Sequence, residues 1–66
     1  MEEKTVESVV AHFKLMKMIS YGQYSGSVNE FRDIIAGNDD ANIAATYYPG
    51  KDIDFFKQVL KELGEI

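Results

Sequence analysis

Apolar residues recur at helical spacing in the first third of the chain. The recurring positions are Val6, Val9, Val10, Phe13, Met16 and Ile19. Intervals of three and four residues place them on one face of an α-helix, and the charged residues fall mostly outside that face. Thr5 is a candidate N-cap, because its hydroxyl can accept a hydrogen bond from a backbone N–H of the first turn. The pattern predicts a helix over roughly residues 3–19.

Residues 21–27, with the sequence YGQYSGS, interrupt this pattern. Two glycines and two serines in so short a stretch are typical of a loop, and we expect its two tyrosines to pack. The following SVNE matches a capping box, in which the Ser27 hydroxyl and the Glu30 carboxylate each accept from the other residue's backbone N–H. Gly37 occupies the position after a helix end. A new apolar face is formed by Val28, Phe31, Ile34 and Ile35. The pattern predicts a loop and then a helix over roughly residues 28–36.

Residues 41–48 allow two interpretations. Asp39 or Asp40 can cap a short helix through Ala41–Tyr47, which must end there because Pro49 disfavours helical geometry at the residue before it. A strand over the same residues is the alternative, since isoleucine, threonine and tyrosine favour strands. The alanines and the capping acids favour the helix, and both interpretations stay open at this point.

The end of the sequence predicts a final helix that begins at Asp52 and closes at Gly64. Its apolar stripe consists of Ile53, Phe56, Val59, Leu60 and Leu63. Four helices joined by short connections favour an irregular or orthogonal bundle over a long up-and-down one. The sequence therefore predicts an all-α fold, in which residues 1–66 form one small domain of about four short helices, with a SAM-like arrangement as one option.

A chain of 66 residues has room for one domain with a thin core. It contains no cysteine, so neither disulfides nor thiolate metal sites can stabilise it. Two sources of stability remain, which are close helix packing and burial against a partner or a second copy. The second source makes a small self-associating, homodimeric structural protein an alternative function.

The net charge of −4 is concentrated in the middle of the sequence, where residues 21–50 carry four acids and one base. A negative field repels phosphate backbones and attracts basic protein surfaces, which argues against direct nucleic-acid binding. Acids at positions 2 and 3 do not fit a signal peptide, and no apolar stretch is long enough to cross a membrane. We therefore expect a cytoplasmic protein that does not associate with a membrane.

Residues suited to catalysis, or to binding a cofactor or metal, are scarce. The single histidine, His12, is expected at the surface of the first helix, and a transition-metal site would need carboxylates almost alone. The acids that follow Asn38 do not fit the EF-hand pattern, which requires glycine at its sixth position and glutamate at its twelfth. We expect a protein that is not an enzyme and that uses no cofactor and no metal.

Residues 38–54 are the strongest candidate for a binding site. No lysine or arginine occurs from Asp33 to Gly50, and the stretch contains two adjacent tyrosines, which supply contact area at low entropic cost. Adjacent helical residues point about 100° apart, so we expect one tyrosine to face inward and one outward, without deciding which. The predicted partner-binding residues are Tyr47, Tyr48, Asp39, Asp40, Asp52 and Asp54. Together they would form an aromatic centre with an acidic rim for a basic protein surface.

Two partial resemblances bear on this prediction. The sequence YYP at 47–49, followed by acids and an amphipathic helix, resembles the end of the colicin-type DNase immunity proteins over the last third of the chain. It lacks the His-Pro-Gly element that precedes the tyrosines in that family, in which this segment binds a basic toxin domain. A second pattern is similar to the YozE-type SAM-like four-helix domains, which have no assigned chemistry. That pattern consists of SVNEF at 27–31, Asp39, YP at 48–49 and DF at 54–55. Neither resemblance assigns the chain to a family.

These observations favour a non-catalytic protein-binding module, and its sharpest form is an acidic inhibitor or immunity-type protein. A helix-turn-helix regulator is a third option, because helices over 28–36 and 40–47 leave a turn of suitable length at Gly37. Its second helix, however, offers no basic residue for phosphates, and Asp33 occupies a place where the motif requires a small residue.

Overall fold

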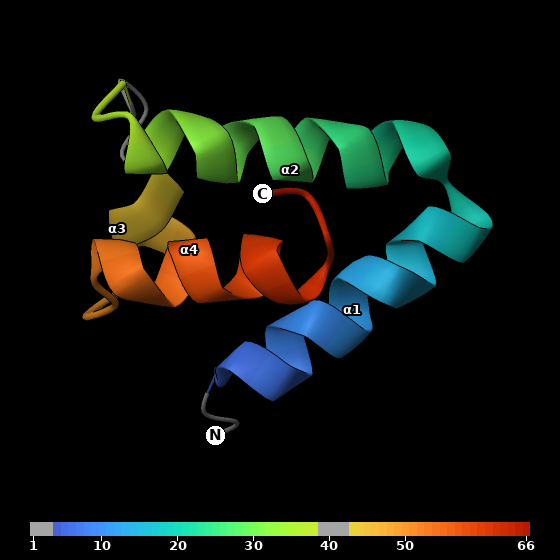
Figure 1. The fold of residues 1–66 in the computed structure, drawn as a ribbon, viewed down its shortest axis with the longest axis horizontal. Helices are drawn as coiled ribbons and strands as arrows, with labels where there is room; N and C mark the ends of the chain where they lie inside the picture. Colours follow the sequence, from blue (N-terminus) through green and yellow to red (C-terminus); the bar gives the residue numbers. More distant parts are fainter. Residues whose placement is uncertain (1–3, 39–42) are drawn as a thin grey trace.

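The computed structural model describes residues 4–38 and 43–66, which form four α-helices and no strand (Figure 1). The helices are α1 (Val6–Ile19), α2 (Tyr21–Ile35), α3 (Ile43–Tyr47) and α4 (Ile53–Glu62). The predicted all-α bundle is confirmed, and within residues 43–47 the helix is correct and the strand is not. No helix in this described part of the chain combines the length and apolarity needed to cross a membrane.

The predicted Thr5 cap of the first helix is confirmed, and α1 begins at Val6, later than the predicted range of 3–19. The Thr5 hydroxyl accepts a hydrogen bond from the Ser8 backbone N–H at 3.1 Å, and the Ser8 hydroxyl accepts one from the Thr5 N–H at 3.0 Å. Ser20 then ends α1 and caps α2, because its extended backbone turns the chain and its hydroxyl accepts from the Gln23 N–H. A single residue therefore forms the corner between the two longest helices.

The predicted loop over residues 21–27 is wrong, because α2 already begins at Tyr21. Tyr24 is only 2% exposed and packs into the core, whereas Gly22 and Gly26 are exposed on the outer side of the helix. A glycine inside a helix costs about 1 kcal/mol relative to alanine, and burial of a tyrosine ring outweighs that cost. The capping box at Ser27 is wrong for the same reason: Ser27 lies within α2, and its hydroxyl donates to the Met16 sulfur at 3.9 Å.

The other predicted helix ends are found where the sequence places them. Gly37 follows the last turn of α2 with φ +80°, a backbone conformation that glycine adopts without strain. The Asp52 carboxylate accepts a hydrogen bond from the Phe55 N–H at 3.0 Å and caps α4. The predicted capping role of Asp39 or Asp40 falls outside the described residues.

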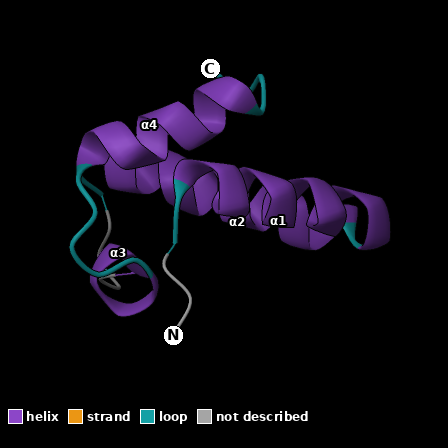
Figure 2. Ribbon diagram, turned by 90° about the horizontal axis from the view of Figure 1, so that it is seen from below, coloured by secondary structure: helices purple, strands orange, loops and turns teal. Residues whose placement is uncertain are grey.

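The core lies between α1, α2 and α4, which all contact one another, whereas α3 contacts only α2 among the described helices. Figure 2 shows α3 end-on at one end of the molecule, with its axis across the other three. Phe31 is at the centre, since its ring lies 4.9 Å from that of Phe13, 5.0 Å from Phe56 and 5.2 Å from Tyr48 between centroids. The buried residues are Val9, Val10, Phe13, Tyr24, Val28, Phe31, Ile34, Phe56, Val59 and Leu60.

Two residues assigned to apolar stripes from the sequence are exposed instead. Ile19 is the last residue of α1 and Ile53 is the first of α4. At these ends each stripe extends beyond the neighbouring helix that covers its middle. The phase of both stripes was predicted correctly, but their buried length was overestimated.

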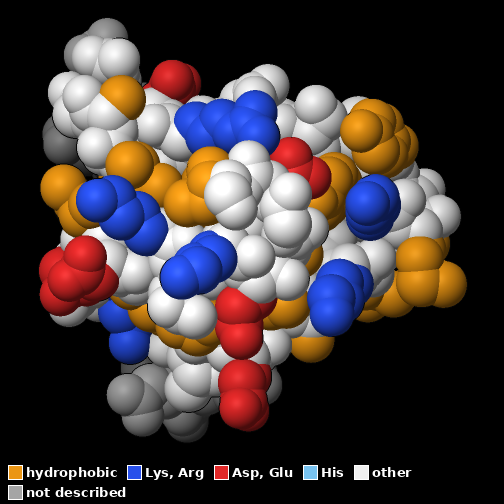
Figure 3. All heavy atoms as spheres, in the orientation of Figure 1, with side chains coloured by type: hydrophobic (Ala, Val, Ile, Leu, Met, Phe, Trp, Pro, Cys, Tyr) orange, Lys and Arg blue, Asp and Glu red, His pale blue; other side chains and the backbone are white. Residues whose placement is uncertain are grey.

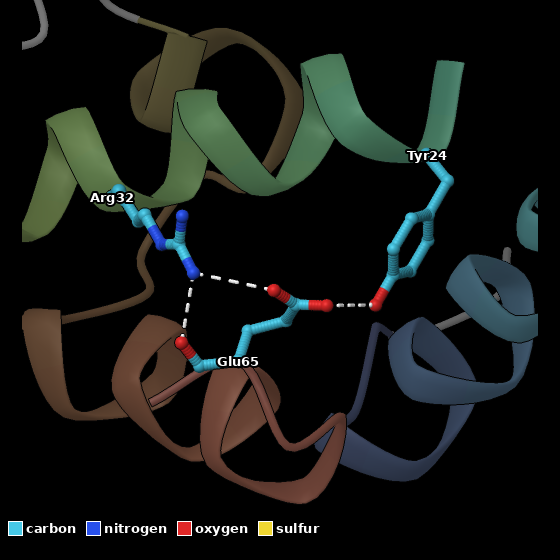
Figure 4. A network of polar contacts seen from close by, with 3 residues as sticks. All are labelled: Tyr24, Arg32 and Glu65. Atoms are coloured by element: carbon cyan, nitrogen blue, oxygen red, sulfur yellow. Dashed lines mark hydrogen bonds and ion pairs between the residues drawn. The ribbon is translucent and has the colours of Figure 1, made fainter. Parts of the chain in front are cut away.

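A polar cluster joins the segment after α4 to α2 (Figure 4). The Tyr24 hydroxyl donates to one carboxylate oxygen of Glu65 at 2.6 Å, and Arg32 donates to the other at 3.2 Å and to the Glu65 carbonyl at 2.8 Å. Burial of the ring, followed by the hydrogen bond and the charge of Glu65, raises the pKa of Tyr24 to about 12. The cluster therefore fixes the buried tyrosine in its protonated form.

Candidate functional site

The predicted site residues that the structure describes lie where α3 gives way to α4, at residues 47–54, here called the α3–α4 edge. Helix α3 ends at Tyr47, and Gly50 with φ +79° turns the chain toward Asp52. The segment 47–54, from the end of α3 to the start of α4, thus lies at one end of the molecule (Figure 1). It contains the predicted site residues Tyr47, Tyr48, Asp52 and Asp54. Asp39 and Asp40 were also predicted to contribute, and both fall outside the described residues.

The two adjacent tyrosines differ in burial, as their angular separation on a helix implies. Tyr47 is 59% exposed, whereas Tyr48 is half-buried and packs its ring edge-on to Phe31 and Phe56. Burial, and secondly the charge of Glu30, raises the pKa of Tyr48 above its ordinary value. Tyr48 therefore attaches the edge to the core, and Tyr47 is the tyrosine that a partner can reach.

The two aspartates line a shallow, open groove beside α3. The residues that line it are Ile34, Ala44, Lys51, Asp52, Ile53, Asp54 and Phe56. Asp52 has a structural role as the cap of α4, and Asp54 is exposed in the first turn, where a negative charge is favourable at a helix N-terminus. Ile53 is an exposed aliphatic side chain between them. The groove therefore offers an apolar centre flanked by two carboxylates.

Two lysines lie among these residues, although the sequence contains no base from Asp33 to Gly50. Lys4 donates to the Tyr47 carbonyl, and its ammonium lies 4.3 Å from the centroid of the Tyr48 ring. The Lys51 ammonium lies 5.1 Å from the Phe55 ring and lines the groove. The edge is thus less negative in space than the sequence indicates, because Lys4, from the start of the chain, folds onto it and adds to Lys51, which belongs to the edge itself.

The side chains that the edge exposes are aromatic, aliphatic and charged. Among the described residues, no three histidine, aspartate or glutamate side chains are grouped so that they could hold a metal. In the same part of the chain every buried side-chain polar atom has a hydrogen-bond partner. His12 is exposed on α1. The edge presents one tyrosine ring, one isoleucine side chain and two carboxylates, with the ammonium groups of Lys4 and Lys51 close by.

A second exposed surface was missed from the sequence. It lies where α1 meets α2 and consists of Leu15, Met18, Ile19 and Tyr21, here called the α1–α2 corner. Ile19 was assigned to the core, and Tyr21 was expected to pack. The signal that could have revealed this surface is the spacing of four and then three residues from Ala11 to Leu15 and Met18, which marks a second apolar face on the first helix.

The chain was compared with protein-family models, curated proteins and solved structures, and none of them matches it.

Proposed function

We propose that this protein is a non-catalytic binding module that holds a basic partner protein against its α3–α4 edge. The observation that carries the proposal is the division of the tyrosine pair, with Tyr48 packed on Phe31 and Tyr47 left 59% exposed beside it. An aromatic side chain on an anchored segment loses little freedom when a partner covers it. Tyr47 is therefore placed to contribute most of the affinity.

The acids have a different role in this proposal. Asp54 is exposed, so its charge is screened by solvent and contributes mainly to the rate of encounter. Lys4 and Lys51 offset part of the negative field, which limits how far charge alone can select a basic partner. We therefore assign attraction and orientation to the carboxylates, and retention of the complex to Tyr47 and Ile53. A cytoplasmic location, which the cysteine-free sequence permits, belongs to the proposal.

The proposal is tested by NMR titration with two synthetic helical peptides that share one leucine stripe and differ only in its flanking residues, lysine in one and glutamate in the other. The lysine-flanked peptide is expected to shift backbone resonances of residues 47–54. Tyr47→Ala should weaken its binding by about 2 kcal/mol through faster dissociation. Asp52→Asn with Asp54→Asn should slow association and flatten its salt dependence, since asparagine keeps the cap of α4 while removing the charge.

The matched control is Tyr21→Ala, which removes a comparably exposed tyrosine at the α1–α2 corner. It should leave binding of the lysine-flanked peptide unchanged. Equal weakening by Tyr21→Ala and Tyr47→Ala, or peptide shifts that avoid residues 47–54, would show that the edge is not the binding surface.

A further inference from the structure

The three most exposed large apolar side chains of the described residues, those of Met18, Ile19 and Tyr21, lie at the α1–α2 corner beside Leu15. Their exposed fractions are 53% for Leu15, 83% for Met18, 74% for Ile19 and 64% for Tyr21. Figure 3 shows hydrophobic side chains at this end of the molecule next to lysine or arginine side chains. A contiguous group of this kind marks an interaction surface more often than scattered single residues do.

Helix α1 is apolar on two opposite faces. Val9, Val10 and Phe13 form the face that is buried against α2 and α4. On the far side, Ala11, Leu15 and Met18 follow one another at intervals of four and three residues, with Ile19 alongside. This is the spacing of a seam between two helices, and a helix that is apolar on both sides is ordinarily covered on both. The outer face of α1 therefore has the geometry to pair with one further helix.

The charge around this face is positive. From Ser8 to Asn29 the chain has no acidic residue, but it contains Lys14 and Lys17. The Lys17 ammonium lies 5.2 Å from the Tyr24 ring, and both lysines lack an ion pair, since Arg32–Glu65 is the salt bridge found within residues 4–38 and 43–66. A partner that brings carboxylates to this face could form ion pairs with these lysines, which have no ion-pair partner among the described residues.

We infer that the outer face of α1, together with Tyr21, is a docking surface for a helix of another protein whose apolar stripe is flanked by aspartate or glutamate. A second copy fits less well. In a two-fold contact centred on Leu15 and Met18 the same patch meets itself, so Lys14 would approach the basic side chains of the other copy. Glu7, the acid at the start of α1, lies about two helical turns from Leu15 and does not offset them there. This surface is separate from the α3–α4 edge and selects partners of the opposite charge.

The same two peptides test this inference, with residues 11–21 as the reporters. The glutamate-flanked peptide is expected to shift resonances of residues 11–21, and the lysine-flanked peptide is expected to leave them in place. Met18→Asp should weaken binding of the glutamate-flanked peptide at least tenfold and keep the melting curve of the unchanged protein, because Met18 makes no core contact. Lys14→Glu should weaken it less and flatten its salt dependence. Ile66→Asp adds the same charge at an exposed apolar residue outside both surfaces, so it is the control and should leave binding of the glutamate-flanked peptide unchanged.

Several results would overturn the inference. The glutamate-flanked peptide could fail to shift the resonances of residues 11–21, or both peptides could shift them equally. Binding of the glutamate-flanked peptide could also be unchanged by Met18→Asp. Sedimentation that shows a dimer dissociated by Met18→Asp would assign the face to a second copy instead. The protein could instead bind vesicles that contain phosphatidylserine, lose this binding in Met18→Asp and bind neither peptide. That result would assign the outer face of α1 to a lipid surface. None of these results bears on the α3–α4 edge, whose own test uses residues 47–54.

Discussion

The α3–α4 edge and the α1–α2 corner both present tyrosine and aliphatic side chains, but their residues differ in what they already do within the chain. At the edge, Tyr48 is packed on Phe31, Asp52 caps α4, and Lys4 lies over the Tyr48 ring. At the corner, Leu15 and Met18 extend from α1 into solvent on the side opposite the core. A substitution of Tyr48 or Asp52 at the edge is therefore expected to disturb folding, whereas one of Leu15 or Met18 at the corner is expected to leave folding unchanged.

This difference shows why residue type is an incomplete guide to a binding surface. Tyrosines and aspartates drew attention to the edge, yet half of the described candidates there, Tyr48 and Asp52, have structural roles. The corner contains no unusual residue type and no charge cluster. We infer an interface there from the position of its side chains: Leu15, Met18 and Ile19 have no structural role that would explain their apolar character, and only the Tyr21 ring, 5.8 Å from that of Tyr24, contacts a core residue.

The largest expected effect comes from a matched pair of leucines. Leu60 is fully buried among α1, α2 and α4, whereas Leu15 is more than half exposed at the corner. Leu60→Ala should lower the free energy of unfolding by about 3 kcal/mol, through lost burial and the cavity left behind. Leu15→Ala should change it by less than about 0.5 kcal/mol. Urea denaturation of both variants measures the difference, and comparable losses would mean that Leu15 is not free of the core.

The tyrosine pair gives the next largest effect. Tyr48→Ala should cost about 2 kcal/mol of unfolding free energy, because it removes a half-buried ring that contacts Phe31 and Phe56. Tyr47→Ala should cost less than about 0.5 kcal/mol. Thermal melting of both variants is the measurement. If Tyr47→Ala lowered the melting temperature more than Tyr48→Ala, Tyr47 would have a structural role. The proposed function would then lose the observation on which it rests, the division of the pair into one packed and one exposed tyrosine.

The smallest of the three effects concerns the tyrosines at the start of α2. Tyr24→Phe removes the hydrogen bond to Glu65 and should cost about 1.5 kcal/mol at neutral pH, whereas Tyr21→Phe should cost almost nothing. The folded protein holds the Tyr24 proton up to a pKa of about 12, above the ordinary value of about 10. Stability linked to Tyr24 is therefore complete below about pH 10 and is lost as the pH rises toward 12.

Tyr24→Phe should accordingly flatten the alkaline loss of stability that the unchanged protein shows between about pH 10 and 12. Tyr21→Phe should leave that loss in place and serves as the control. Denaturation midpoints across this range provide the test. An identical alkaline slope in the unchanged protein and in Tyr24→Phe would mean that the Tyr24 hydroxyl is not held by Glu65 in the folded state.

Local sequence signals predicted much of the fold. The caps at Thr5 and Asp52, the stop at Gly37 and the apolar stripes of α1 and α4 each depend on a few neighbouring residues, and each was found. The loop predicted at 21–27 failed because glycine content was weighed above spacing. Tyr24 and Val28 lie four residues apart and continue the stripe of α2 upstream, and tertiary burial of that stripe overrides the low helix propensity of glycine.

The candidate site was predictable as a group of residues but not as an electrostatic surface. The absence of bases from Asp33 to Gly50 is a property of the linear chain, and Lys4 reaches the edge only through the packing of α1. Helix geometry predicted that one of Tyr47 and Tyr48 would face inward and the other outward. Which of the two faces inward depends on where α2 and α4 lie. Long-range contacts of this kind are not encoded in any single stretch.

The position of α3 has a further consequence for how the protein opens. Helices α1, α2 and α4 close on one another, so each is held from two sides, whereas the backbone of α3 comes close to α2 alone among the described helices. A short helix held by one neighbour can detach while the remaining three stay folded, in a sub-global opening that needs less free energy than complete unfolding. Amide protons of α3 would then exchange with solvent sooner than those of the other three helices. The packing of Tyr48 on Phe31 and Phe56 limits this opening at the C-terminal end of α3, where Tyr47 lies.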